Sequence, residues 1–208
     1  MSVMPWYLWV GLFIFIGSVI WRVACLYINV PWPFWLSWVL HNPYMLVFCH
    51  PATIVKRMEG SSLADVLEIG CGAGRVLVPF AQLNPNCRFI GLDLQLRMIR
   101  KAEKLVKKTK LQNVEILQGD IRHRPFANRS FDLIYMVTVL GEIPARKQVI
   151  RDVCRLLKSG GRFSVTEVIP DPCYQTIGSV RRLFDRLGMV EESVEKGLLS
   201  YTITFVKN

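Results

Sequence analysis

Apolar runs alternate with amphipathic stretches over the last two-thirds of the chain. Continuous apolar runs predict strands near 65–70, 88–93, 114–118, 131–136 and 161–167. Apolar residues at helical spacing predict helices near 73–83, 95–108, 144–157 and 174–187. Strands that alternate with helices in this way are typical of a doubly wound α/β sheet whose strands are mostly parallel.

The last two apolar runs follow each other without an intervening helix. They cover about 189–196 and 199–206, and Lys196-Gly197 lies near the turn between them. Two strands joined by so short a connection predict a hairpin. The sheet is therefore expected to end in an antiparallel strand, whereas a dehydrogenase sheet would be wholly parallel.

A long apolar segment opens the chain. Sixteen residues from Trp6 to Trp21 carry no charge, which as a helix is about 24 Å, and extension to Ile28 gives about 34 Å. A bilayer core is about 30 Å thick, and Arg22 near one end can reach the headgroups. We expect a transmembrane helix within 1–30. A monotopic or re-entrant insertion and a buried core helix are the alternatives.

A second apolar segment follows Pro31 and Pro33, which end any preceding helix. Its apolar side chains recur at helical spacing at Phe34, Trp35, Trp38 and Val39. This pattern favours an amphipathic interfacial segment and a linker helix within 31–60. The alternative is an apolar flap packed on the following domain.

With one exception, the charged residues begin where the apolar N-terminal segments end. Through Val55 the only charged side chain is Arg22, and all six Trp lie at or before Trp38. The rest carries 25 Lys or Arg against 16 Asp or Glu. We therefore expect a water-facing domain over 61–208. The positive charges that follow the apolar segment predict that this domain faces the cytoplasm.

The segment Glu68-Ile-Gly-Cys-Gly-Ala-Gly74 carries the strongest chemical signal. It follows the apolar pair Val66-Leu67, so its glycines form a turn after a buried strand, where backbone can approach a ligand. The next predicted strand ends in Asp93, which is placed to accept hydrogen bonds from ribose hydroxyls. Arg75 occupies the position where a dinucleotide fingerprint needs its third glycine, which opposes a nicotinamide-dependent oxidoreductase.

With these motifs, the chain from about Val66 to its C-terminus resembles the class I S-adenosylmethionine (SAM)-dependent methyltransferases. The resemblance implies a Rossmann-like, seven-stranded sheet and SAM as cofactor. It places Met98 over the adenine and Asp120 at the adenine amino group. Glu68, a carboxylate among buried strand ends, needs a partner and is expected to bind the methionine ammonium; the alternative is a structural hydrogen bond to the glycine turn. The cofactor-binding residues implied are Glu68, Gly70, Cys71, Gly72, Gly74, Asp93, Leu94, Met98, Asp120, Ile121, Met136 and Val137.

No catalytic residue follows from the sequence. A sulfonium donor is already activated, so a base is needed only when the acceptor must lose a proton. The residues Leu140 to Pro144 are expected to face the acceptor. The candidate bases are His123, Tyr135, Glu142, Glu167, Asp171 and His41, and none stands in a pattern that selects it. The six Cys show no paired spacing, so we expect reduced thiols and no metal.

The acceptor class rests on two features. Residues Thr166 to Pro172 resemble the region after strand five of quinone C-methyltransferases, and phospholipid N-methyltransferases are similar through the core. The apolar segments add a membrane as a partner. We therefore expect a lipophilic small-molecule or lipid acceptor. A soluble acceptor and a catalytically silent SAM-binding scaffold are the alternatives.

A basic stripe lies on the helix predicted near 95–108. Residues 97, 101, 104 and 108 share one side of it. Such a stripe is either a solvated face or a contact for anionic headgroups. No aromatic platform accompanies it, so no nucleic-acid partner is expected. The sequence does not set the oligomeric state.

Overall fold

The computed structural model describes a folded domain and a few isolated residues before it. The described residues are Pro5, Trp9, Ile16, Gly17, Ile20, 50–58, 63–123, 126–169, Asp171 and 173–208. The predicted transmembrane helix and the segment around 34–40 lie almost entirely outside these residues. Within the described part of the chain, no helix combines the length and the apolar character needed to cross a bilayer.

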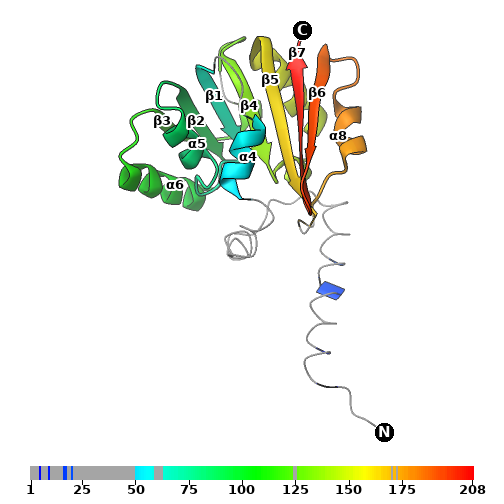
Figure 1. The fold of residues 1–208 in the computed structure, drawn as a ribbon, viewed down its shortest axis with the longest axis horizontal. Helices are drawn as coiled ribbons and strands as arrows, with labels where there is room; N and C mark the ends of the chain where they lie inside the picture. Colours follow the sequence, from blue (N-terminus) through cyan, green and yellow to red (C-terminus); the bar gives the residue numbers. More distant parts are fainter. Residues whose placement is uncertain are drawn as a thin grey trace.

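Seven strands form one twisted mixed sheet (Figure 1). The strands are β1 (Asp65–Ile69), β2 (Arg88–Asp93), β3 (Val114–Gln118), β4 (Phe131–Val137), β5 (Leu157–Val168), β6 (Met189–Lys196) and β7 (Ser200–Lys207). Their order is β3-β2-β1-β4-β5-β7-β6. Strands β1 to β5 are parallel, and β7 runs antiparallel to both β5 and β6. The predicted hairpin and the mixed sheet are confirmed.

Helices cover both faces of the sheet. They are α4 (Pro51–Met58), α5 (Leu77–Leu83), α6 (Leu96–Thr109), α7 (Arg146–Leu156) and α8 (Ile177–Leu183), with short 3-10 turns η2 (Ile121–His123) and η3 (Leu140–Glu142). Neighbouring strand residues point to opposite faces. Val66 therefore packs with α4 and α5, while Leu67 packs with α7 and α8. Strand β1 is buried on both faces, as a central parallel strand must be.

Helix α5 begins later, and helix α8 ends earlier, than the apolar patterns predict. Helix α5 begins at Leu77, because Gly74 has a φ of +79° that a right-handed helix cannot contain. Helix α8 ends at Leu183, and Arg186 two residues past the C-cap Phe184 has a φ of +63°. Both boundaries are decided by single left-handed residues.

The residues between the predicted helix near 144–157 and the predicted strand near 161–167 belong to strand β5 itself. The pairing of β4 with β5 jumps from Phe131↔Leu157 to Leu133↔Arg162, so the intervening residues bulge out of the ladder. Gly160 allows this bulge through its φ of +73°. Strand β5 consequently starts at Leu157, ahead of the predicted residue 161.

Helix α4 belongs to the folded domain. Its residues Ile54, Val55 and Met58 are buried in the core cluster that also contains residues of α5 and of the sheet. Figure 1 shows the helix lying across the near side of the strands. The Arg162 side chain also donates a hydrogen bond to the Met58 carbonyl oxygen at 3.1 Å. The domain therefore includes this part of the segment 31–60.

Candidate functional site

A cavity of about 420 Å³ opens where the parallel strands β1, β2 and β4 end. Ligand sites in open α/β sheets lie at this edge, where neighbouring crossovers diverge. The lining comes from four connections that follow successive strands, within the ranges 68–76, 92–98, 119–122 and 137–149. Its volume is in the usual range for a small-molecule site.

The glycine turn after β1 forms one wall. Gly70 has a φ of +74°, and a Cβ there would lie 2.4 Å from Cγ2 of Val139, so only glycine lets this side chain pack on the turn. A Cβ at Gly72, with a φ of +53°, would meet no atom within 4 Å. The backbone at Gly72 is therefore bare toward the cavity, as a closely bound ligand requires.

Asp93 ties the end of β2 to that turn. Its Oδ2 accepts a hydrogen bond from the Gly72 N–H at 2.8 Å, and its Oδ1 accepts one from the Gln95 N–H at 2.8 Å. Burial raises the pKa of this carboxyl, while these backbone donors oppose the rise. A carboxylate oxygen has two lone pairs, so both oxygens can still accept from hydroxyl groups in the cavity.

Glu68 lies at the inner end of the cavity and is 2% exposed. The Tyr135 hydroxyl donates a hydrogen bond to its Oε2 at 2.9 Å. Burial raises the pKa of Glu68 to about 8, the Tyr135 bond opposes the rise, and the nearby Asp93 charge adds to it. Glu68 is therefore largely protonated at neutral pH until a cation enters the cavity.

Asp120 is held by an unanticipated partner, Arg122. The Nε of Arg122 donates to both oxygens of Asp120 at 3.0 Å, and Nη2 donates to Oδ2. These bonds lower the pKa of Asp120. Both side chains line the cavity. The resemblance assigns the Asp120 carboxylate to the adenine amino group. In the structure this carboxylate also binds the guanidinium of Arg122, which lines the same wall of the cavity.

Ten of the twelve residues predicted to bind the cofactor line this cavity. Gly74 does not, because it faces the helices, where a Cβ would lie 3.3 Å from Val78 and 3.5 Å from Ala102. Met136 does not either, because it is fully buried in the core on the α7 and α8 side of the sheet. Contact with the cofactor stays a prediction for the other ten, which are Glu68, Gly70, Cys71, Gly72, Asp93, Leu94, Met98, Asp120, Ile121 and Val137.

The end of the cavity after β4 is mostly apolar. Its side chains are Val137, Val139, Ile143, Pro144 and Val149, with Thr138 and Glu142 as the polar members. Of the residues expected to face an acceptor, Leu140 and Gly141 lie instead in the core, where Gly141 packs directly against the Cys173 backbone.

The structure separates the candidate bases. Among the described residues, only Glu142 of that group lines the cavity. Tyr135 is buried against Glu68, Glu167 and Asp171 are buried outside the lining, and the His123 side chain is 78% exposed. His41 lies outside the described residues. Within the described ranges, no group of three His, Cys, Asp or Glu side chains could hold a metal ion.

Several lining residues carry no sequence signal of their own. Gln95, Arg122, Thr138 and Val149 belong to this set. Thr138 is the clearest case, because its φ of +55° is rare for a residue branched at Cβ and follows directly on β4. Only the spacing of Arg122 from Asp120 offered a hint that these two side chains would meet.

The fold and the cavity together define a Rossmann-like methyltransferase architecture, with β7 antiparallel in the sheet and a carboxylate facing a glycine turn. A family model described as "Methyltransferase domain" matches residues 61–196, and the chain belongs to this family. The cofactor of such enzymes is SAM. The bare backbone at Gly72, the Asp93 carboxylate and the buried acid Glu68 fit its nucleoside and amino-acid parts.

Relatives and solved structures agree with this assignment. The chain is 32% identical to a demethylmenaquinone methyltransferase from Lactobacillus johnsonii over 54% of this chain and 47% of the relative. It is 35% identical to an arsenite methyltransferase from Halobacterium salinarum over 50% of this chain and 27% of the relative. The match thus spans about half, or less, of these relatives.

A SAM-dependent methyltransferase from Aquifex aeolicus has the same fold. It superposes with a TM-score of 0.73 over 81% of this chain and 95% of its own, at 20% identity. This similarity extends the shared architecture to nearly all of the folded domain.

Proposed function

We propose that this protein transfers the methyl group of SAM to a lipophilic acceptor of the quinone or membrane-lipid type. The observation that carries the proposal is the apolar end of the cavity, formed by Val137, Val139, Ile143, Pro144 and Val149. An acceptor bound there lies against side chains that favour a hydrophobic ring or chain and exclude water. The similarity to demethylmenaquinone methyltransferase supports the same class.

The opposite end of the cavity holds the donor. SAM, when bound, supplies an electrophilic methyl group on a sulfonium. Asp93 accepts hydrogen bonds from the ribose hydroxyls, and Glu68 in its ionised form pairs with the methionine ammonium. The bare Gly72 backbone lets the ligand approach the end of β1 closely. These residues orient the donor toward the apolar end, and alignment supplies most of the acceleration such a displacement needs.

Glu142 is the residue placed to take a proton from the acceptor. It lies beside Ile143 and Pro144 in the lining. A carbon or oxygen acceptor forms its bond to the methyl carbon as the carbon–sulfur bond breaks, and then has a proton to lose. The Glu142 carboxylate can accept that proton, whereas an acceptor with no proton to lose does not need it.

The membrane is part of the proposal because the N-terminal segments of the sequence are apolar. Residues 1–30 insert into the bilayer, the segment from residue 31 up to helix α4 leads along its surface, and the folded domain that begins with α4 faces the cytoplasm, where SAM is made. Deletion of residues 1–30 should release the protein from membranes. Retention in the membrane pellet after that deletion and a high-salt wash, which screens contacts of surface charges, would assign the anchor to the segment around 34–40.

The test is methyl transfer from labelled SAM to three acceptor pools. A lipid extract containing quinones should be labelled, while a pool of water-soluble acceptors and arsenite should not. An Ile143→Asn variant should raise the KM for the lipid acceptor and leave SAM affinity unchanged, because it makes only the acceptor end polar. Labelling confined to soluble acceptors would contradict the proposal, and SAM binding without any product would favour a silent scaffold.

A further inference from the structure

Helix α6 concentrates the positive charge of the protein. Its fourteen residues include six basic side chains and one acidic one, Glu103, a net charge of +5 against +10 for the whole chain. Half of the net charge therefore lies on one helix. Lys110, which caps the helix in a left-handed conformation, adds another positive charge at the end.

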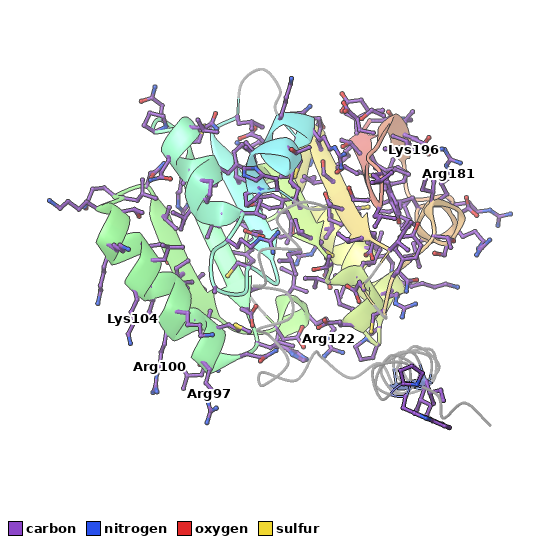
Figure 2. All side chains as sticks on the ribbon, turned by 60° about the horizontal axis from the view of Figure 1, so that its bottom comes forward. Arg97, Arg100, Lys104, Arg122, Arg181 and Lys196 are labelled. Carbon is purple, nitrogen blue, oxygen red and sulfur yellow. The ribbon has the colours of Figure 1, made fainter. Side chains whose placement is uncertain are left out.

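The basic side chains share the outward side of the helix. Met98, Ile99 and Ala102 are buried, and α6 packs alongside β2 and β3. Arg100 and Lys104 are exposed on the opposite side, one turn apart. Figure 2 shows Arg97, Arg100 and Lys104 projecting in a row from α6 into solvent. Like charges one turn apart destabilise a helix, so an external anionic surface would relieve this repulsion.

The same edge of the molecule carries the rim of the cavity. Leu94 and Met98 line the cavity, so the first turn of α6 is part of its wall. Leu94 is 55% exposed and Leu96 is 45% exposed, which leaves two large apolar side chains next to the basic row. Figure 2 shows Arg122, another lining residue, on the same lower side as Arg97.

We propose that the outward face of α6, with Leu94 and Leu96 at its start, docks on an anionic phospholipid bilayer. The α6 face, defined by Leu94, Leu96, Arg97, Arg100, Lys104 and Lys107, would then present the cavity rim to the membrane surface. This inference rests on the proposed function, since docking brings a lipid-dissolved acceptor to the rim. The α6 face would be a second membrane contact besides the apolar N-terminal segment, and it would set the orientation of the domain on the bilayer.

The chemistry of the face favours a bilayer over a nucleic acid. Basic residues near a membrane surface are attracted by anionic lipids, and apolar neighbours insert below the headgroups. A single-stranded nucleic acid would need aromatic side chains on which bases stack. Helix α6 has none, and the exposed apolar side chains at its start are Leu94, which precedes the helix, and Leu96.

The test uses the full chain reconstituted in vesicles and reads the reactivity of individual lysines. One vesicle is phosphatidylcholine alone, and the other contains about 30% phosphatidylglycerol to supply anionic headgroups. An amine-reactive label followed by mass spectrometry reports each lysine. Labelling of Lys104 and Lys107 should fall by about five-fold in the anionic vesicles and recover in high salt, because salt screens exposed charges. Lys196 should be labelled equally in both, since β6 lies at the other edge of the sheet from β3 and α6.

A pair of charge-matched variants separates docking from net charge. Arg100→Glu/Lys104→Glu should lose the protection of Lys107, while Arg182→Glu/Lys196→Glu should keep it. All four positions are exposed, and thermal unfolding checks that both variants fold. Equal labelling of Lys104 in the two vesicles would overturn the inference, as would protection of Lys104 by a single-stranded RNA and not by anionic vesicles.

The outcome is separable from that of the proposed function. Methyl transfer to a detergent-dispersed lipid extract needs no bilayer. Normal transfer in detergent without lysine protection in anionic vesicles would overturn the docking face alone. Lysine protection without any methyl transfer would overturn the proposed function alone.

Discussion

The Tyr135 hydroxyl lies 2.9 Å from Oε2 of Glu68; the two buried residues are direct partners across the neighbouring parallel strands β4 and β1. Buried carboxyl groups are costly in their charged form, and one phenol donor does not replace the water that an ionised carboxylate loses. The pKa of Glu68 consequently rises to about 8. Below this pH the Glu68 carboxyl is neutral in the ligand-free protein, and a cation bound next to it would favour its ionised form.

We expect the stability of the protein to fall as pH rises because of Glu68. Its folded pKa of about 8 lies above its ordinary value of 4.5, so the folded state holds the proton more tightly. The contribution is complete below pH 4.5 and is lost as pH rises through about 8, by a few kcal/mol. Urea unfolding at pH 5 and pH 9 should show a smaller fall for Glu68→Gln, which stays neutral and can still accept from Tyr135. Equal pH dependence of the two proteins would contradict this.

Binding of SAM should release a proton. Below pH 8 the ligand-free Glu68 is mostly protonated, and a nearby ammonium favours its ionised form. Calorimetric titration at pH 7 in buffers of different ionisation enthalpy should therefore give a buffer-dependent heat. Glu68→Gln should bind with a heat that does not depend on the buffer. The same dependence in both proteins would remove Glu68 from the ammonium site.

Replacement of Asp93 should weaken SAM binding while the fold is kept. Asp93→Ala removes the proposed acceptor for the ribose hydroxyls and the two hydrogen bonds from the Gly72 and Gln95 N–H groups. Hydrogen bonds to charged groups contribute about 1.5–3 kcal/mol, so affinity should fall about 10- to 100-fold. Glu115→Ala, on neighbouring β3 and outside the cavity lining, is the control. Calorimetry would refute the placement if Asp93→Ala bound SAM normally.

Gly70 and Gly72 should respond differently to the same substitution. Both have positive φ, so alanine is strained at each by about 1–2 kcal/mol. At Gly70 the new Cβ also meets Val139 at 2.4 Å, whereas at Gly72 it meets nothing within 4 Å. Gly70→Ala should thus cost about 1–3 kcal/mol more in unfolding free energy. Adding Val139→Ala to Gly70→Ala should reduce the difference in unfolding free energy between the Gly70 and Gly72 variants. An unchanged difference would show that the contact with Val139 is not its cause.

Glu142→Gln should slow methyl transfer without affecting SAM binding. The amide cannot accept a proton, so kcat should fall about 100-fold or more with an acceptor that must lose one. Glu195→Gln, on β6 away from the cavity, is the control. Turnover at the unchanged rate would show that the acceptor needs no base from the protein.

Strands β1, β2 and β4 of this domain are predictable because each is a short, mostly apolar run that is buried in the sheet. Strands β2 and β3 have the predicted bounds, because β2 buries the run between its polar end residues, and the alternating pattern of β3 leaves Glu115 and Gln118 exposed while its apolar side chains are partly buried. The start of α5 and the end of α8 were not predictable, because they depend on positive φ at Gly74 and Arg186. The spacing of apolar residues does not predict a positive φ at a single position.

By itself, the sequence determined the order of strands and helices, the glycine turn after β1 and the acid at the end of β2. These follow from local rules, namely the alternation of side chains and the freedom of glycine. Only the tertiary structure decided that Tyr135 meets Glu68, that Val139 packs on Gly70, and that Met136 is buried on the α7 and α8 side of the sheet. The physical reason is that long crossovers bring the ends of parallel strands together, so partners distant in sequence are set by sheet order and register.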